Sequence, residues 1–212
     1  MRLKTFFIDL DDTLYPPSAG IWERIRERMS LFMLERLHIP SDEIQPLRHC
    51  LYETYGTTLR GLELVYHIDT DEFLRFVHDV PIEDCISPDP LLRQVLHAYP
   101  QRKIIFTNAD CLHAERVLAA LNLADCFESI IDIRQIHPNC KPQPEAFSAA
   151  LAIAGETDPS ECLMADDSDR NIEAARAAGL FTIHVTTQDP HPSAHHHLAH
   201  LRDLPTVLPV GE

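Results

Sequence analysis

Long apolar runs are absent from this sequence of 212 residues, and none approaches the roughly 18 residues that a membrane-spanning helix needs. We therefore expect no membrane insertion. Residues 1–9 carry basic side chains before an apolar stretch, but that stretch is shorter than the core of a signal peptide and ends in acids. We interpret it as a strand of a cytoplasmic protein.

Paired cysteines and clustered basic residues are also missing. The six cysteines are scattered, with no Cys-x-x-Cys pair and no histidine spacing typical of zinc, which favours reduced thiols in the cytoplasm. Lys and Arg do not cluster and the formal net charge is -15, so we expect no nucleic-acid partner, since phosphate backbones bind to clustered cations. Surface charge is screened beyond about 8 Å, so a phosphorylated ligand would need local positive charge. The sequence does not specify an oligomeric state.

Short apolar runs alternate with helical patterns along most of the chain. The runs are compact, as in strands buried inside a parallel sheet. The helical patterns have typical end signals, such as Asp89 before Pro90 and Gly179 after the last pattern. The alternation predicts an α/β fold, a doubly wound Rossmann-like parallel sheet. The predicted strands are residues 5–8, 103–106, 130–133, 162–165 and 181–185, and the predicted helices are residues 90–98, 110–121, 144–154 and 169–178.

One long segment after the first strand departs from this alternation. It is too long for a single crossover and has helical periodicities of its own, one of them at Ile21, Ile25, Met29 and Phe32. Prolines mark both of its ends. We therefore predict an inserted all-helical cap. The predicted domains are a Rossmann-like core of residues 1–15 and 88–187, a helical cap of residues 16–87 and a surface tail of residues 188–212.

Polar residues gather after four of the predicted strands. In an open α/β sheet the carboxyl ends of the strands line one crevice, so these side chains would meet there. A solvated turn explains any one of them, but it does not explain their recurrence at four strand ends. The residues are Asp9, Asp11, Asp12 and Thr13, then Thr107 and Asn108, then Lys141, and finally Asp166 and Asp167.

Charge predicts a divalent cation in this crevice. Four carboxylates would face one lysine, and unpaired carboxylates at close range repel one another. Oxygen ligands without nearby His or Cys favour a hard ion such as Mg²⁺. The expected ligands are the carboxylates of Asp9 and Asp167, the backbone carbonyl of Asp11, and Asp166 directly or through water.

Four short motifs, in their order and spacing, resemble those of the haloacid dehalogenase superfamily over nearly the whole predicted core. They agree with the predicted strand ends, and this agreement makes the resemblance specific, whereas one Asp-x-Asp-x-Thr motif alone would be weak. The motifs are Asp9-x-Asp11-x-Thr13, Thr107, Lys141 and Asp166-Asp167.

This resemblance implies a magnesium-dependent hydrolysis of small phosphate monoesters. Asp9 would attack phosphorus and form an aspartyl-phosphate, since a carboxylate needs no deprotonation at neutral pH. Asp11 would protonate the leaving alkoxide and then activate the hydrolytic water. Thr107, Asn108 and nearby backbone amides would hold the phosphoryl oxygens. Lys141 and Mg²⁺ would stabilise the charge on the transferring group.

Longer segments resemble the pyrimidine 5'-nucleotidase-like subgroup, and this resemblance extends into the predicted cap. It implies a nucleoside 5'-monophosphate as substrate, with a pyrimidine base as the first expectation. Residues 55–61 are predicted to form a loop in which Tyr55, Thr58 and Arg60 contact the base or ribose. The alternative is an ordinary turn between helices. The resembling segments are residues 7–16, 55–62, 107–110 and 166–172.

Two positions depart from the superfamily pattern. Many members carry a second acid four residues after the last motif aspartate, where this chain has Asn171, which we expect to support the loop. Many members have glycine at position 12, where Asp12 is expected to cap the turn and to take no part in catalysis.

Several alternatives stay open. The same fold serves sugar phosphatases, phosphomutases and haloacid dehalogenases, although a dehalogenase would leave Asp11 without a role. A non-catalytic sensor of phosphorylated ligands is an alternative from another class. Asp110 either caps its helix or belongs to the site, and His113 either lies on a polar helix face or takes part in function. The histidines around residues 195–197 either bind a transition metal or lie solvated.

Overall fold

The chain forms two compact units in a computed structural model that describes residues 3–210. The core unit comprises Met1–Ala19 and Ile86–Glu212, and the helical unit comprises Gly20–Cys85. Residues 1, 2, 211 and 212, which the predicted core and tail included, lie outside the described residues.

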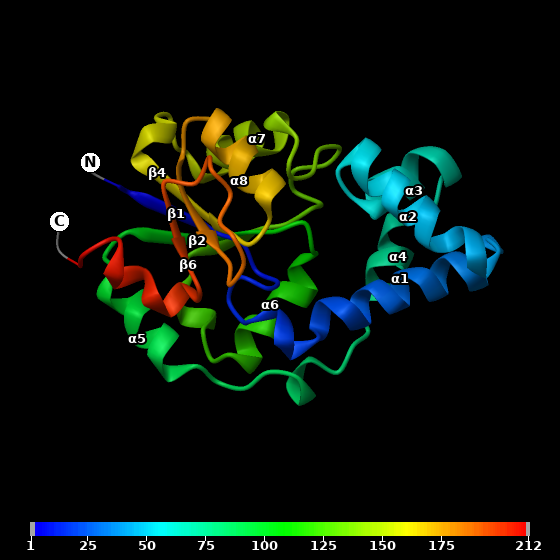
Figure 1. The fold of residues 1–212 in the computed structure, drawn as a ribbon, viewed down its shortest axis with the longest axis horizontal. Coiled ribbons are helices and arrows are strands. Elements are labelled where there is room, and N and C mark those ends of the chain that lie inside the picture. The colour runs from blue at the N-terminus through cyan, green and yellow to red at the C-terminus, as the bar shows by residue number, and fades with distance from the viewer. Residues whose placement is uncertain (1–2, 211–212) are drawn as a thin grey trace. The chain divides into compact units, whose positions relative to one another are not determined.

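The core unit contains a six-stranded sheet in the order β3-β2-β1-β4-β5-β6 (Figure 1). Every neighbouring pair of strands is parallel. This arrangement confirms the predicted doubly wound Rossmann-like fold. The strands are β1 (Thr5–Ile8), β2 (Arg102–Phe106), β3 (Ser129–Ile131), β4 (Cys162–Asp166), β5 (Phe181–Val185) and β6 (His196–Leu198).

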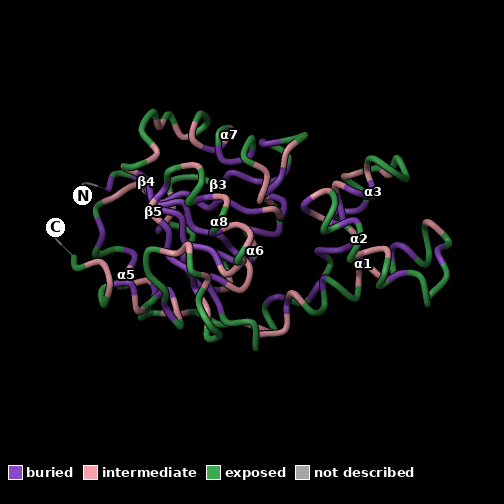
Figure 2. The backbone as a smooth tube through the Cα atoms, turned by 45° about the horizontal axis from the view of Figure 1, so that its top comes forward, coloured by how far each residue is buried: buried purple, intermediate pink, exposed green. Residues whose placement is uncertain are grey.

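Helices flank this sheet and seal its apolar strands from water. Asp89 caps the first of them by accepting from the backbone N–H groups of Leu91 and Leu92, as its place before Pro90 predicted. Phe7 and Phe106 of the strands pack with Phe147 of a flanking helix in a core that is buried throughout (Figure 2). The α-helices are α5 (Pro90–Ala98), α6 (Cys111–Ala120), α7 (Pro144–Ala154) and α8 (Asp169–Ala177), and the short 3-10 helices are η1 (Pro17–Ala19), η3 (Ala124–Cys126), η4 (Pro159–Glu161) and η5 (Leu201–Thr206).

The strand order brings the ends of β1 and β4 side by side. The chain winds outward from β1 through β2 to β3 and then returns to place β4 on the other side of β1. Ile8 pairs with Ala165, and the Asp9 backbone N–H donates to the Ala165 carbonyl at 2.9 Å. Ligands bind at such a reversal of strand order in open α/β sheets. The residue that directly follows β1 is therefore a neighbour of the residue that ends β4.

The prediction of a surface tail from residue 188 is wrong. β6 extends the sheet next to β5, and η5 contacts α5. The side chains of Leu198, Leu201 and Leu204 are buried, which supplies the hydrophobic contact that holds this segment. A strand of three residues, two of them histidine, has too short an apolar pattern to be recognised from the sequence.

The helical unit is built on the apolar stripe that the sequence predicted. Ile21, Ile25 and Met29 are buried, and Phe32 packs edge-on against Phe73 with ring centroids 5.0 Å apart. The elements of this unit are α1 (Ile21–Leu37), α2 (Ser41–Tyr55), α3 (Thr58–Tyr66), α4 (Thr70–Val77) and the 3-10 helix η2 (Ile82–Asp84).

The loop predicted for residues 55–61 is also wrong, because most of that segment is helical. α2 ends at Tyr55, Gly56 links the two helices with a φ of 91°, and α3 begins at Thr58. Gly61 lies inside α3, where a Cβ atom would meet Leu51 side-chain atoms at 2.7 Å. The glycine therefore permits close packing of α3 on α2. Because glycine has a low helix propensity, a prediction from propensity alone did not find this helix.

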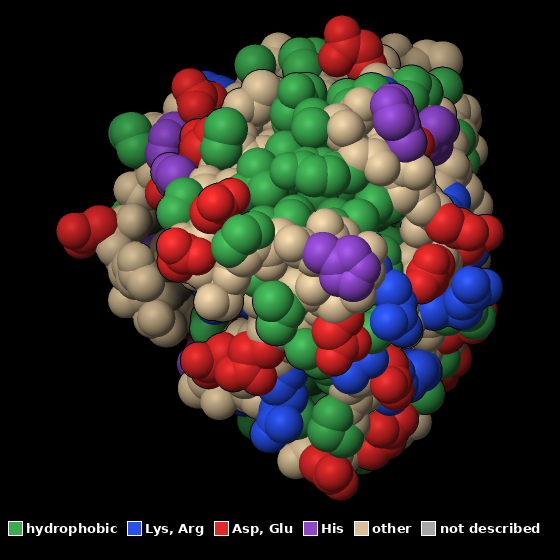
Figure 3. Space-filling model, turned by 90° about the vertical axis from the view of Figure 1, so that its right-hand side faces the viewer, with side chains coloured by type: hydrophobic (Ala, Val, Ile, Leu, Met, Phe, Trp, Pro, Cys, Tyr) green, Lys and Arg blue, Asp and Glu red, His purple; other side chains and the backbone are tan. Residues whose placement is uncertain are grey.

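Among residues 3–210, no helix is both long enough and apolar enough to cross a membrane. On the face shown in Figure 3, basic side chains lie among acidic ones. This mixture agrees with the scattered Lys and Arg residues of the sequence.

Candidate active site

Three carboxylates meet where β1 and β4 end. Asp9 directly follows β1, Asp166 is the last residue of β4, and Asp167 is the next residue. One ligand atom from each side chain lies within 4.8 Å of the others. Asp9 and Asp166 are buried, whereas Asp167 is partly exposed. The fold thus brings together three of the four carboxylates that the sequence predicted to converge.

Lys141 inserts its ammonium group into this carboxylate cluster. Its Nζ donates to an oxygen of Asp9 at 2.7 Å, to an oxygen of Asp166 at 2.7 Å and to the backbone carbonyl of Phe106 at 2.8 Å. Burial alone would lower the pKa of Lys141, but the charges of Asp166 and Asp9 outweigh burial and raise it above its usual value. The ammonium group therefore stays charged.

The remaining negative charge in the cluster is not fully balanced by this lysine. Burial raises the pKa of Asp9 to about 7, against an opposing effect of Lys141 and with a further rise from Asp166. Burial and then the charges of Asp166 and Asp9 raise the pKa of Asp167 to about 9. Both shifts indicate a site that favours an additional cation or bound protons.

The loops after β2 and β3 hold Lys141 through Asn108. The Asn108 side-chain amide donates to the Lys141 carbonyl and accepts from the Lys141 N–H, both at 2.9 Å. Thr107 is buried, and its hydroxyl oxygen accepts from the Ala109 N–H at 3.0 Å. The Asn108 side chain therefore positions the lysine, and the substrate contact predicted for Asn108 stays a prediction.

Asp11 is held by two side chains from different parts of the core unit. The Tyr15 hydroxyl donates to Asp11 Oδ1 at 2.5 Å, and His113 Nε2 lies 2.8 Å from the same oxygen. Burial and the Asp11 charge raise the pKa of Tyr15 well above its usual range, so its hydroxyl stays protonated. Asp110 caps α6 by accepting from the His113 N–H at 3.1 Å. His113 is buried, so the interpretation of a polar helix face is wrong for this residue.

Neighbouring residues shape the loops that carry the acids. Asp12 has a φ of 60°, a left-handed conformation that explains why a glycine also suits this position. Asn171 donates to both oxygens of Asp166, at 2.9 and 3.1 Å, which confirms its expected supporting role. His184 of β5 lies with Nε2 2.9 Å from the Asp167 carbonyl oxygen.

Sequence reasoning missed Tyr15 and His184 as parts of this site. Tyr15 lies four residues after Asp11 in a turn, and that spacing was a usable signal. His184 lies in a predicted strand adjacent to β4, but its contact with the loop after β4 depends on the strand order, which local patterns do not specify.

The three cap residues assigned to substrate binding lie in the helical unit. Arg60 donates to Glu63 at 2.6 Å within α3, and Thr58 is buried at the first position of that helix. Thr57 is the residue that caps α3, since its hydroxyl accepts from the Arg60 N–H at 3.0 Å. A Cβ atom on Gly61 would lie 3.0 Å from the Tyr55 ring. Arg60 thus has an ion-pair partner inside its own unit, Thr58 is buried there, and the Tyr55 ring lies close to Gly61.

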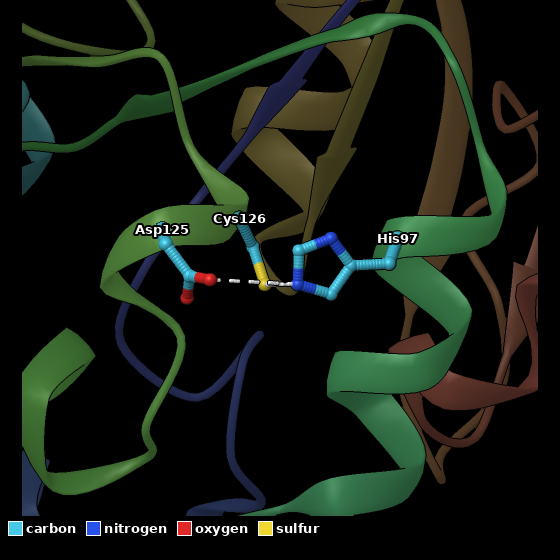
Figure 4. A group of neighbouring side chains, drawn as sticks. All are labelled: His97, Asp125 and Cys126. Atoms are coloured by element: carbon cyan, nitrogen blue, oxygen red, sulfur yellow. Dashed lines mark hydrogen bonds and ion pairs between the residues drawn. The ribbon is translucent and has the colours of Figure 1, made fainter.

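A second group of potential metal ligands lies elsewhere in the core unit (Figure 4). His97 of α5 and Asp125 and Cys126 of η3 bring a ring nitrogen, a carboxylate oxygen and a sulfur within 4.8 Å of one another. Arg93 already binds both oxygens of Asp125, one of them at 2.6 Å, and its guanidinium lies 3.9 Å from the Cys126 sulfur. Because a fixed guanidinium supplies the positive charge there, we assign this group a structural role in joining α5 to η3.

A family profile of haloacid dehalogenase-like hydrolases matches residues 3–179. The match covers most of the chain and includes all the acids of the cluster. The protein therefore belongs to the haloacid dehalogenase-like hydrolases.

Curated relatives and solved structures resemble the chain over different lengths. Phosphate metabolism protein 8 of Saccharomyces cerevisiae is 29% identical over 191 residues, which cover 84% of this chain and 60% of that protein. Fructose-1-phosphate phosphatase YqaB of Escherichia coli is 30% identical over 103 residues, covering 48% of this chain and 54% of that protein. The chain thus spans less than two thirds of either relative.

A solved structure shares the fold over nearly the whole chain. The haloacid dehalogenase (HAD) hydrolase YfnB from Bacillus subtilis, bound to magnesium, matches with a TM-score of 0.63 at 16% identity. The match covers 99% of this chain and 100% of that chain. At this identity the likeness establishes the fold alone.

Proposed function

We propose that the protein is a Mg²⁺-dependent phosphatase that hydrolyses small phosphate monoesters through an aspartyl-phosphate on Asp9. The observation that carries this proposal is the contact of Lys141 Nζ with oxygens of both Asp9 and Asp166, each at 2.7 Å. A buried nucleophilic carboxylate beside a fixed ammonium suits attack on an anionic phosphoryl group, because the ammonium reduces charge repulsion. The E. coli relative is named as a phosphatase, which supports the same class of reaction, and the name of the yeast relative refers to phosphate metabolism.

The donor set fits a hard divalent cation. Asp9, Asp166 and Asp167 offer only oxygen atoms, within 4.8 Å of one another, as Mg²⁺ prefers. The raised pKa values of Asp9 and Asp167 follow from burial and from repulsion by neighbouring carboxylates, which a dication would relieve. The carboxylates of Asp9 and Asp167 would hold the ion with the Asp11 carbonyl, and Asp166 directly or through water. When bound, the ion would neutralise charge on the phosphoryl oxygens.

The residues around Asp9 determine how it attacks. Lys141 binds Oδ1 of Asp9, so attack on phosphorus comes from Oδ2, which the Thr13 hydroxyl approaches at 3.4 Å. The phosphoryl oxygens are held by the Thr107 hydroxyl, by backbone N–H groups that include that of Asn108, and by Lys141.

Asp11 moves the proton in both steps. In the first step it donates to the leaving oxygen as the ester P–O bond breaks, which yields the alcohol. In the second step its carboxylate accepts a proton from water as the water oxygen bonds to phosphorus and releases Asp9. A dehalogenase does not need this acid, so the contacts that hold Asp11 favour the phosphatase.

Turnover of p-nitrophenyl phosphate tests the proposal against a non-catalytic phosphate sensor. A phosphatase releases p-nitrophenol with many turnovers when Mg²⁺ is present. A sensor binds phosphate without release of product, and that result would remove the proposed activity.

We also propose that the substrate is a nucleoside 5'-monophosphate, with a pyrimidine base first, and that the reaction is cytoplasmic. The core groups address the phosphoryl group that all monoesters share, so selectivity requires contacts to the rest of the substrate. Residues of the helical unit, Tyr55, Thr58 and Arg60, are our candidates for those contacts. The scattered free cysteines support the location. Phosphate release from about a hundred phosphorylated metabolites, sugar phosphates included, would identify the preferred class.

Replacing Arg60 by alanine should lower kcat/KM for the best nucleotide by about tenfold or more, equivalent to about 1.4 kcal/mol. The substitution removes binding energy only from a substrate that is large enough to contact Arg60. The value of kcat/KM for p-nitrophenyl phosphate should therefore be almost unaffected. Arg36→Ala is a matched control, since Arg36 also pairs with an acid of the helical unit, Glu72. Equal losses on both substrates would make Arg60 structural, and no loss would exclude it from the site.

Stabilisation by Mg²⁺ should increase with pH. The pKa values of Asp9 and Asp167, raised from 3.8 to about 7 and about 9, mean that the folded chain holds these protons more tightly than the unfolded chain. Without a cation, the two bound protons stabilise the folded chain fully at a pH below the pKa of these groups in the unfolded chain. This stability is lost as the pH rises through their pKa values in the folded chain. Mg²⁺ replaces the protons, so its binding becomes more favourable as pH rises.

Differential scanning calorimetry with Mg²⁺ and with chelator, at about pH 5.5 and about pH 8.5, measures this effect as a larger gain in Tm at the higher pH. Asp9→Asn should reduce the pH dependence, because one titrating ligand is gone. A gain that is the same at both pH values would contradict the assignment of these carboxylates as ligands.

A further inference from the structure

We propose that Tyr15 and His113 are positioning residues for Asp11, whose two hydrogen bonds to Oδ1 direct the transferable proton to Oδ2. The inference rests on the proposed function, in which Asp11 is the general acid and then the general base. It assigns a task to two side chains that do not touch phosphorus.

The contacts come from two separate elements of the core unit. Tyr15 lies in the turn after β1 and reaches back four residues to Asp11, with its hydroxyl 2.5 Å from Oδ1. His113 belongs to α6, 102 residues farther along the chain, and its Nε2 lies 2.8 Å from the same oxygen. Figure 1 shows α6 beside the chain that leaves β1. Two donors from different elements restrict rotation of the carboxyl group more than one donor does.

Burial makes these hydrogen bonds persistent. The His113 side chain is 0% exposed and that of Asp11 is 14% exposed, and Tyr15 is also buried. Water therefore competes weakly for Oδ1, and each bond is stronger than at the surface. The backbone of His113 is fixed in turn, because its N–H donates to the helix cap Asp110 at 3.1 Å.

The chemistry follows from which oxygen accepts. In a protonated carboxyl group one oxygen carries the hydrogen and the other is the carbonyl acceptor. With the Tyr15 hydroxyl and His113 Nε2 both donating, Oδ1 is the acceptor, so the proton resides on Oδ2. It passes from Oδ2 to the leaving alkoxide as the P–O bond breaks. Later Oδ2 accepts a proton from water while the same two donors hold the carboxylate.

Leaving-group dependence separates positioning from a structural role. The experiment measures kcat/KM of wild type, Tyr15→Phe, His113→Leu and His113→Gln on phosphate monoesters ranging from p-nitrophenyl phosphate to an alkyl phosphate. This parameter reports the steps up to loss of the alcohol. An alkoxide leaving group needs a proton from Asp11, whereas p-nitrophenolate leaves without one. We therefore expect kcat/KM to fall by about tenfold or more on the alkyl ester and by about threefold or less on the aryl ester.

Two further variants complete the test. Gln presents an amide N–H near the position of His113 Nε2, so His113→Gln should recover activity on the alkyl ester relative to His113→Leu. Tyr99→Phe is the matched control, because Tyr99 is also buried and its hydroxyl donates to the backbone carbonyl of Leu208. It should leave the dependence on the leaving group unchanged.

The outcomes distinguish the inference from the function on which it rests. Losses that are uniform across the series, or absent throughout, would overturn positioning by Tyr15 and His113. Failure of Gln to recover the alkyl ester would overturn the donor role of His113. A wild-type protein that hydrolyses none of the esters would instead overturn the proposed function.

Discussion

Asp9→Asn should abolish phosphate release and leave the fold intact. Asparagine has the shape of aspartate, but its neutral amide cannot attack phosphorus, and the neighbouring carboxylate of Asp166 is fully buried and bound by Lys141 Nζ. We expect less than about a hundredth of wild-type turnover, a difference of about 2.7 kcal/mol in barrier height or more. Release of inorganic phosphate from p-nitrophenyl phosphate measures it.

Asp12→Asn provides the matched control for this variant. Asp12 lies three residues away, and asparagine tolerates its φ of 60°. It should keep most of the activity, while both variants should unfold within a few degrees of the wild type. Residual activity of Asp9→Asn above the stated level would exclude Asp9 as the nucleophile.

Chelation should stop turnover completely, and added Mg²⁺ should restore it. Without a dication, the carboxylates of Asp9, Asp166 and Asp167 repel both one another and the substrate phosphate. Ca²⁺ should be a poor substitute, because it accepts more ligands and a looser geometry around the nucleophile. Steady-state assays after dialysis against chelator measure the loss and the recovery.

Addition of Zn²⁺ in place of Mg²⁺ after dialysis against chelator is a second comparison. An all-oxygen site should not favour Zn²⁺, because that ion prefers nitrogen and sulfur ligands. Full activity in chelator would remove the cation from the mechanism.

The sheet and the acid cluster could be predicted because their signals are local. Thr5–Ile8 and Phe181–Val185 are apolar runs with polar residues beyond them, and the observed strands have the predicted bounds. Parallel strands end at one edge, so the position of Asp9 and Asp166 after such runs was enough to predict their proximity.

The parts that were missed depend on contacts between distant segments. The contact between His113 and Asp11 spans 102 residues, and no local pattern specifies it. β6 is held by the burial of Leu198, Leu201 and Leu204, although its own sequence is mostly histidine. α3 contains Gly61, whose low helix propensity is overridden by close packing against Leu51 of α2.

Trapping of the covalent intermediate tests the central claim most directly. In Asp11→Asn, p-nitrophenyl phosphate should still phosphorylate the protein, because its leaving group needs no acid, whereas the second step lacks its base. Mass spectrometry of a sample quenched in acid after one turnover should find the phosphoryl group on the peptide that contains Asp9. Release of p-nitrophenol with no phosphoryl group on the protein, or with one on another residue, would contradict the account.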